Sequence, residues 1–191
     1  MTTLVRIDEV MRQPWRNSGG RTRELLAWPE SSNWAFRISV ADIEADGAFS
    51  IFPGVQRWFA VLEGAGVELT IDGFPKRLTR NAAPLRFSGA SVTTCRLLDG
   101  PTLDLNLMLR DAPGRIQAVA DGAEWRPALA QCGLFTAVAG HCRADGATTT
   151  VPSCALLWFE RAPASLSFAA VQGSPSAPGW WLEAGAEETP R

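Results

Sequence analysis

A strict alternation of apolar residues over positions 34–41 constrains the fold more than any other stretch. Its apolar members are Trp34, Phe36, Ile38 and Val40. A period of two places successive side chains on opposite faces of a β-strand. Residues 57–62 predict a second strand, which follows a turn-rich connection. Each of the two strands carries an arginine, Arg37 or Arg57, and both arginines are therefore expected in one neighbourhood.

The rest of the chain predicts more short strands and no long helix. They are expected at 21–28, 67–71, 85–87, 91–98, 103–109, 134–138, 148–151, 155–159 and 165–171, with Trp180-Trp181-Leu182 as an edge strand. Many short strands separated by turns indicate an all-β antiparallel sandwich or barrel. Ala112-Pro113-Gly114 is the best boundary. We therefore expect a barrel over residues 1–112 and a second, smaller half over 113–191 that packs on the first.

Composition excludes several classes of protein. The net charge is −2 and Lys76 is the only lysine, whereas phosphate binding needs clustered Lys and Arg. No nucleic-acid partner is expected. No apolar run approaches the roughly 18–20 residues that span a bilayer, and the N-terminus lacks a secretory pattern. We expect a cytoplasmic protein with no membrane association, in which the four cysteines are free.

Metal and cofactor chemistry find little support in the sequence. His141 is the only histidine, and no cluster of histidine and carboxylate residues accompanies it. A transition-metal site of the usual imidazole type is therefore improbable, as is a Ser-His-Asp triad. We expect no metal and no cofactor.

Polar residues alternate with apolar ones on three of the predicted strands. They are Arg37, Ser39, Arg57, Asp104 and Asn106. Such side chains usually face solvent, but in a small closed barrel they line the interior, where one ligand fits. Arginine suits a carboxylate because its planar fork matches two oxygens. Alternatively, Arg37 or Arg57 pairs with Asp42, Asp46 or Asp104 as a structural ion pair. Trp15, Trp34 and Trp58 are either pocket walls or core residues.

Four motifs in register resemble the HutD/Ves family of cupin-like proteins. They are Pro14-Trp15-Arg16-Asn17-Ser18-Gly19-Gly20 with Thr22 and Glu24, Trp34-Ala35-Phe36-Arg37-Ile38-Ser39, residues 46–54 (DGAFSIFPG), and Asp104-Leu105-Asn106-Leu107-Met108. The usual family forms are PWKNGGG, WRLSIA, DGPFSxFPG and DLNLM. Arg16 and Ser18 depart from the first of these. The resemblance is strong over about residues 5 to 110 and weak beyond them.

The resemblance implies a cupin-like double-stranded β-helix, or jelly roll, with a second, degenerate cupin-like half, that is, a bicupin. It also implies a cupin without a metal. The residues that match the motifs, and are carried over as ligand-binding candidates, are Trp15, Asn17, Thr22, Arg37, Ser39, Ser50, Arg57 and Asn106. The HutD branch is associated with bacterial histidine utilisation and the Ves branch with stress responses.

Three functions stay open at this point. The first is a binding module for a small organic acid such as histidine, urocanate or a formylated glutamate. Binding of the acid then regulates histidine catabolism. The second is a cofactor-independent isomerase, lyase or hydrolase, in which Glu24 or Asp104 is the general base. The third is a stress-related interaction protein, in which Trp180 and Trp181 bury an interface. A homodimer is compatible with all three.

Overall fold

The computed structural model describes residues 1–15, 18–110, 112–172 and 177–187. Apart from a short 3-10 turn, η1 (Ile7–Glu9), the regular elements in these ranges are strands. Contacts divide the chain into two compact units. The first unit is Val10–Asp111, and the second unit joins Met1–Glu9 to Ala112–Arg191.

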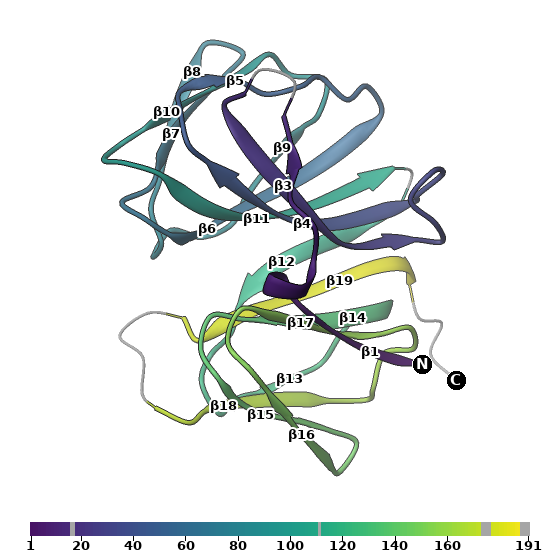
Figure 1. The fold of residues 1–191 in the computed structure, drawn as a ribbon. Coiled ribbons are helices and arrows are strands. Elements are labelled where there is room, and N and C mark those ends of the chain that lie inside the picture. The colour runs from purple at the N-terminus through teal and green to yellow at the C-terminus, as the bar shows by residue number, and fades with distance from the viewer. Residues whose placement is uncertain (16–17, 111, 173–176, 188–191) are drawn as a thin grey trace. The chain divides into compact units, whose positions relative to one another are not determined.

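The first nine residues belong to the second unit, whereas the sequence pattern assigned them to the first half. Strand β1 (Thr2–Arg6) pairs antiparallel with β17 (Ala155–Phe159), and Thr2 lies opposite Phe159. Figure 1 shows β1 running alongside β17. A pairing between residues about 150 positions apart leaves no trace in local alternation, which explains the different assignment.

The first unit consists of two sheets. The larger sheet has the order β2 (Gln13–Pro14), β3 (Gly20–Trp28), β4 (Phe36–Ile43), β11 (Thr102–Arg110), β6 (Val55–Glu63), β9 (Leu85–Ser88). The smaller sheet has the order β5 (Gly47–Ala48), β10 (Thr93–Leu97), β7 (Val67–Ile71), β8 (Phe74–Leu78).

The second unit has the same design. Its larger sheet has the order β1, β17, β14 (Leu129–Thr136), β19 (Gly179–Glu187), β12 (Gly114–Ala118). Its smaller sheet has the order β13 (Glu124–Trp125), β18 (Leu166–Ala170), β15 (Gly140–Ala144), β16 (Ala147–Val151). Strand β19 is central, between β14 and β12, so the expectation of an edge strand at Trp180-Trp181-Leu182 is wrong.

Eight consecutive strands occupy equivalent positions in the two units. In both β4–β11 and β12–β19, the first, eighth, third and sixth strands form one sheet, and the second, seventh, fourth and fifth form the other. This is the strand order of a jelly roll built from Greek keys. The all-β prediction is thus confirmed, with two double-sheet halves.

Each unit has its own apolar core. In the first unit, one cluster joins Phe59 and Val61 of β6 to Val67 and Leu69 of β7 in the facing sheet. In the second unit, the cluster includes Trp125, Leu134, Leu157, Phe168 and Trp181. Within the described residues, no helix is long and apolar enough to cross a membrane.

Candidate ligand-binding cavity

The first unit contains a cavity of about 520 Å³. Its lining combines aromatic rings, small residues and a few polar groups, as in many small-molecule sites. The lining residues are Pro14, Trp15, Thr22, Arg37, Ser39, Ala41, Ala48, Phe49, Ser50, Phe52, Arg57, Asn106 and Met108.

Three adjacent strands supply the most polar wall. Ser39 on β4 lies opposite Asn106 on β11, and Met108 on β11 lies opposite both Arg37 on β4 and Arg57 on β6. Because residues two apart on a strand share a face, these five side chains project to the same side of the sheet. The alternation in the sequence therefore places two guanidinium groups and an amide around one space.

Arg57 is the most deeply buried cation of the cavity, with 8% of its surface exposed. Its Nη2 donates a hydrogen bond to Oδ1 of Asn106 at 3.0 Å, and its Nε has no partner. Among the described residues, no carboxylate lies within ion-pair distance of it. Burial and, to a smaller extent, the positive charge of Arg37 lower the pKa of Arg57 to about 10.

Arg37 lies nearer the surface and is partly neutralised. Its Nη1 is 3.9 Å from Oε2 of Glu24, and its Nη2 contacts the sulfur of Met108 at 3.1 Å. Burial lowers the pKa of Arg37, Glu24 raises it, and Arg110 lowers it. The alternative of a structural ion pair with an aspartate does not hold for Arg37 in the described chain, where its partner is Glu24.

An aromatic wall faces these groups. Trp15 donates its Nε1–H to Oγ1 of Thr22 at 2.7 Å, and its ring meets Phe49 edge-on at 6.1 Å. The guanidinium of Arg57 lies 4.9 Å from the ring centre of Phe49. A side chain at position 20 would clash with the Asp42 carbonyl and crowd the Trp15 ring, so Gly20 permits this close packing.

Seven of the eight candidate residues line this single cavity: Trp15, Thr22, Arg37, Ser39, Ser50, Arg57 and Asn106. The eighth, Asn17, lies outside the described residues. Sequence reasoning did not select Phe49, Phe52 or Met108 as lining residues. The signals were available, because both phenylalanines lie within two residues of Ser50 in its motif and Met108 follows Asn106 at the spacing of one strand face.

Neither carboxylate proposed as a general base lines the cavity. Asp104 is fully buried, and burial raises its pKa to about 8, although a hydrogen bond from Thr102 opposes the shift. Glu24 accepts a hydrogen bond from Ser31 at 2.6 Å and faces Arg37. Trp58 is on the face of β6 opposite to Arg57 and is not a pocket wall. Trp34 packs with Val55 and Met108.

The described residues contain no group of three or more His, Cys, Asp or Glu side chains that could hold a metal ion. Arginine, asparagine and serine instead offer hydrogen-bond donors. Two guanidinium groups in a partly enclosed space attract an anion, and their fixed forks favour a carboxylate.

Comparisons with known proteins fit this geometry. A model of the HutD family matches residues 7–174. The chain is 40% identical over 117 residues, 60% of either chain, to an uncharacterized 21.2 kDa protein in the hutC 3′ region of Pseudomonas putida. It is 40% identical over 99 residues to protein Ves of Citrobacter koseri. That match spans 50% of this chain and 51% of Ves, so the chain spans only about half to three-fifths of these relatives.

A solved structure is similar over nearly the whole chain. The structure of HutD from Pseudomonas fluorescens SBW25 superimposes with a TM-score of 0.83 at 26% identity, and the match covers 99% of this chain and 100% of that one. Cupin-like structures of lower sequence identity, such as protein Ylba from E. coli at 12% with a TM-score of 0.69, are similar to this chain in fold only. The cupin-like, two-half fold expected from the sequence is therefore confirmed.

Proposed function

The chain belongs to the HutD family, and on that premise we propose that its first unit binds a small organic acid, using Arg57 and Arg37 to hold the carboxylate. The acid belongs to histidine catabolism, and binding serves the regulation of that pathway. The same proposal includes a cytoplasmic location and binding through the protein's own side chains without a metal. It also includes no nucleic-acid or membrane partners. A homodimer is compatible with it.

One observation carries the proposal: Arg57 is a buried guanidinium that faces a cavity without a carboxylate partner in the described chain. An unpaired buried charge is unfavourable because desolvation is not offset by an opposite charge. A carboxylate beside the partnerless Nε of Arg57 and the neighbouring Asn106 would supply the missing opposite charge. A buried polar atom without a partner calls for an explanation, and a bound carboxylate would supply one.

The link to histidine catabolism rests on similarity. The relative from Pseudomonas putida takes its name from the hutC 3′ region, and a solved neighbour is itself called HutD. These names describe those proteins. For this chain they select which acids to test first: histidine, urocanate and formylglutamate.

A thermal-shift titration tests the proposal. An acid present at 100 times its dissociation constant should stabilise the folded protein by about 2.7 kcal/mol. The methyl ester of the same acid should have no effect, because it lacks the charge that Arg57 recognises. Arg57→Met should abolish the shift while the variant melts at the same or a higher temperature.

Arg86→Met is the matched control, since Arg86 is exposed on the neighbouring strand β9 and does not line the cavity. It should keep the wild-type response. If none of the acids raises the melting temperature, or if Arg57→Met responds as the wild type does, the proposal is wrong.

A further inference from the structure

Arg110 continues the row of side chains that reaches into the cavity. On β11, residues Asp104, Asn106, Met108 and Arg110 are spaced two apart and share one face of the strand. Asp104 is at the fully buried end and Arg110 is at the exposed end. Asn106 and Met108, between them, line the cavity. Arg110 therefore lies on the solvent side of the lining.

Trp34 holds Arg110 beside the cavity arginine. The guanidinium carbon of Arg110 is 4.3 Å from the centre of the Trp34 ring, and that of Arg37 is 5.3 Å from the same ring. Only 6% of Trp34 is exposed, and it packs against Met108. Stacking on a buried indole fixes a guanidinium that would otherwise move freely at the surface.

The three arginines form a graded series from solvent to interior. Arg110 is exposed, the side chain of Arg37 is 24% exposed, and Arg57 is 8% exposed. Neighbouring arginines in the series affect one another electrostatically. The charge of Arg110 lowers the pKa of Arg37, and the charge of Arg37 lowers the pKa of Arg57. In the described chain no carboxylate is within ion-pair distance of Arg110.

Like charges held close together oppose folding unless an oppositely charged group binds beside them. Such a row also raises the local concentration of anions and directs them inward, more strongly when walls of low dielectric focus the field. A charge at the entrance affects the association rate, whereas a charge at the final site affects dissociation.

We propose that Arg110, held on Trp34, is an entrance residue that captures anions at the surface and passes them by way of Arg37 to Arg57. This role rests on the proposed binding of a carboxylate in the same cavity. Arg110 accelerates entry and is not itself part of the inner binding site.

Stopped-flow fluorescence with urocanate as the probe tests the kinetic part. At low salt, Arg110→Gln should reduce the association rate constant about 3- to 10-fold, and the difference should shrink at 0.5 M salt because screening removes the attraction. The dissociation rate constant should stay within twofold of the wild-type value. If the association rate is unchanged, or only the dissociation rate increases, the proposal is overturned.

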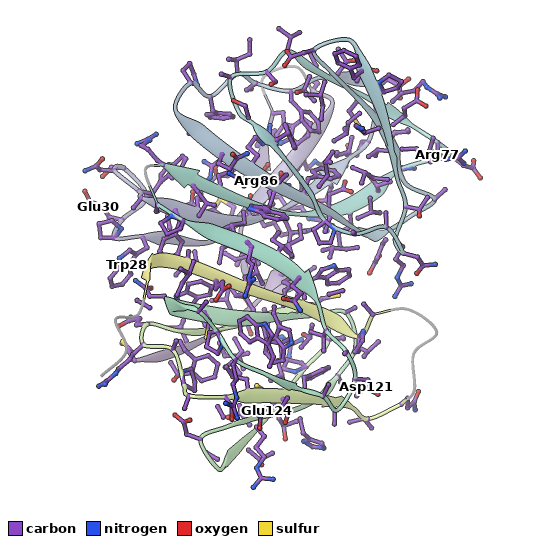
Figure 2. All side chains as sticks on the ribbon, turned by 180° about the vertical axis from the view of Figure 1, so that it is seen from behind. Trp28, Glu30, Arg77, Arg86, Asp121 and Glu124 are labelled. Atoms are coloured by element: carbon purple, nitrogen blue, oxygen red, sulfur yellow. The ribbon has the colours of Figure 1, made fainter. Side chains whose placement is uncertain are left out.

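Arg77→Gln is the matched control. It removes the same charge from the exposed edge strand β8 of the other sheet, where Figure 2 shows Arg77 at the margin of the molecule. It should associate with urocanate as fast as the wild type does. An equal slowing by both substitutions would indicate a general charge effect and contradict a specific role for Arg110.

Tryptophan quenching by iodide gives a readout that needs no natural ligand. Relative to neutral acrylamide, iodide should quench the Trp34-dependent fluorescence about half as well in Arg110→Gln as in the wild type, and Trp34→Phe identifies that component. An unchanged ratio would overturn the entrance role. If the wild type does not bind urocanate yet this ratio falls, the proposed function fails for that acid while the role of Arg110 stands.

Discussion

The two units share one strand order but treat buried polar groups differently. Among the described residues, five buried side-chain polar atoms lack a hydrogen-bond partner, and all five are in the first unit. Two of them are the Nε atoms of Arg37 and Arg57, and a third is Oδ1 of Asp104. The unit with the cavity is thus the one with unmet hydrogen-bonding capacity.

In the described part of the second unit, the buried polar side chains find partners within the protein. Oε2 of Glu183 accepts hydrogen bonds from the backbone N–H groups of Ala128 and Leu129, and its Oε1 pairs with Arg115. Its apolar core includes Trp125 and Trp181, which stack at 4.8 Å with nearly parallel rings. The same strand order therefore surrounds stacked tryptophans in one half and a cavity in the other.

The largest expected loss of stability follows from removing a tryptophan from the core of the second unit. Trp181→Ala should lower the free energy of unfolding by about 3–5 kcal/mol, because it empties a fully packed site. Trp15→Ala in the first unit should cost less, since Trp15 is half-buried and already borders a cavity. Denaturant titration measures both. Equal losses would contradict the difference in packing between the units.

Replacing the buried carboxylates Asp104 and Glu183 by amides should change the stability of the protein in opposite directions. The pKa of Asp104 is about 8, above the ordinary 3.8. Between pH 4 and 8 the unfolded chain has lost a proton that the folded chain keeps, so stability falls as pH rises. Asp104→Asn should remove this dependence and raise stability at pH 7.5 by about 1–3 kcal/mol. Thermal melts from pH 5 to 8 measure it.

Glu183→Gln is the comparison in the second unit. This side chain has a cationic partner and two N–H donors, so the substitution should destabilise the protein by about 1.5–3 kcal/mol. Stabilisation by Glu183→Gln, or an unaltered pH dependence in Asp104→Asn, would show that the two carboxylates do not differ as described.

The smallest effect concerns the partial neutralisation of Arg37. Glu24→Gln removes a carboxylate 3.9 Å from its guanidinium and should tighten urocanate binding by about twofold, or roughly 0.5 kcal/mol, because both side chains are partly exposed. Glu44→Gln makes the same charge change at an exposed pair with Arg21 and should leave affinity unaltered. Calorimetric titration distinguishes them, and weaker binding by Glu24→Gln would contradict the expected competition.

Local alternation was enough to predict much of the first unit. It identified β4 and the polar face that carries Arg37 and Ser39. The resemblance to the HutD/Ves motifs, and not alternation, selected Thr22 and Ser50, which the structure places around the same cavity. The second unit was harder, because the interior place of the strand that carries Trp181 follows from its pairing with both β12 and β14, which are distant in the sequence. No internal repeat is visible in the sequence, although the two units share their strand order.

Register across strands explains the remaining differences. The sequence predicts an apolar and a polar face for β11, and both are buried, as Leu105 and Asn106 on opposite faces show. The partner of Arg37 is Glu24, which lies next to a β-bulge, because the register of β3 against β4 shifts between Glu24 and Leu26. Irregular pairing of this kind follows from contacts among strands and not from the residues of one strand.

Nitrogen-15 NMR of the arginine Nε–H groups most directly tests whether Arg57 binds the carboxylate. On titration with urocanate, the Arg57 Nε–H signal should shift and exchange more slowly with solvent, because its free donor gains an acceptor, while the Arg77 signal stays in place. If the Arg57 signal does not move at urocanate concentrations that raise the melting temperature, the acid binds elsewhere and the central claim is contradicted.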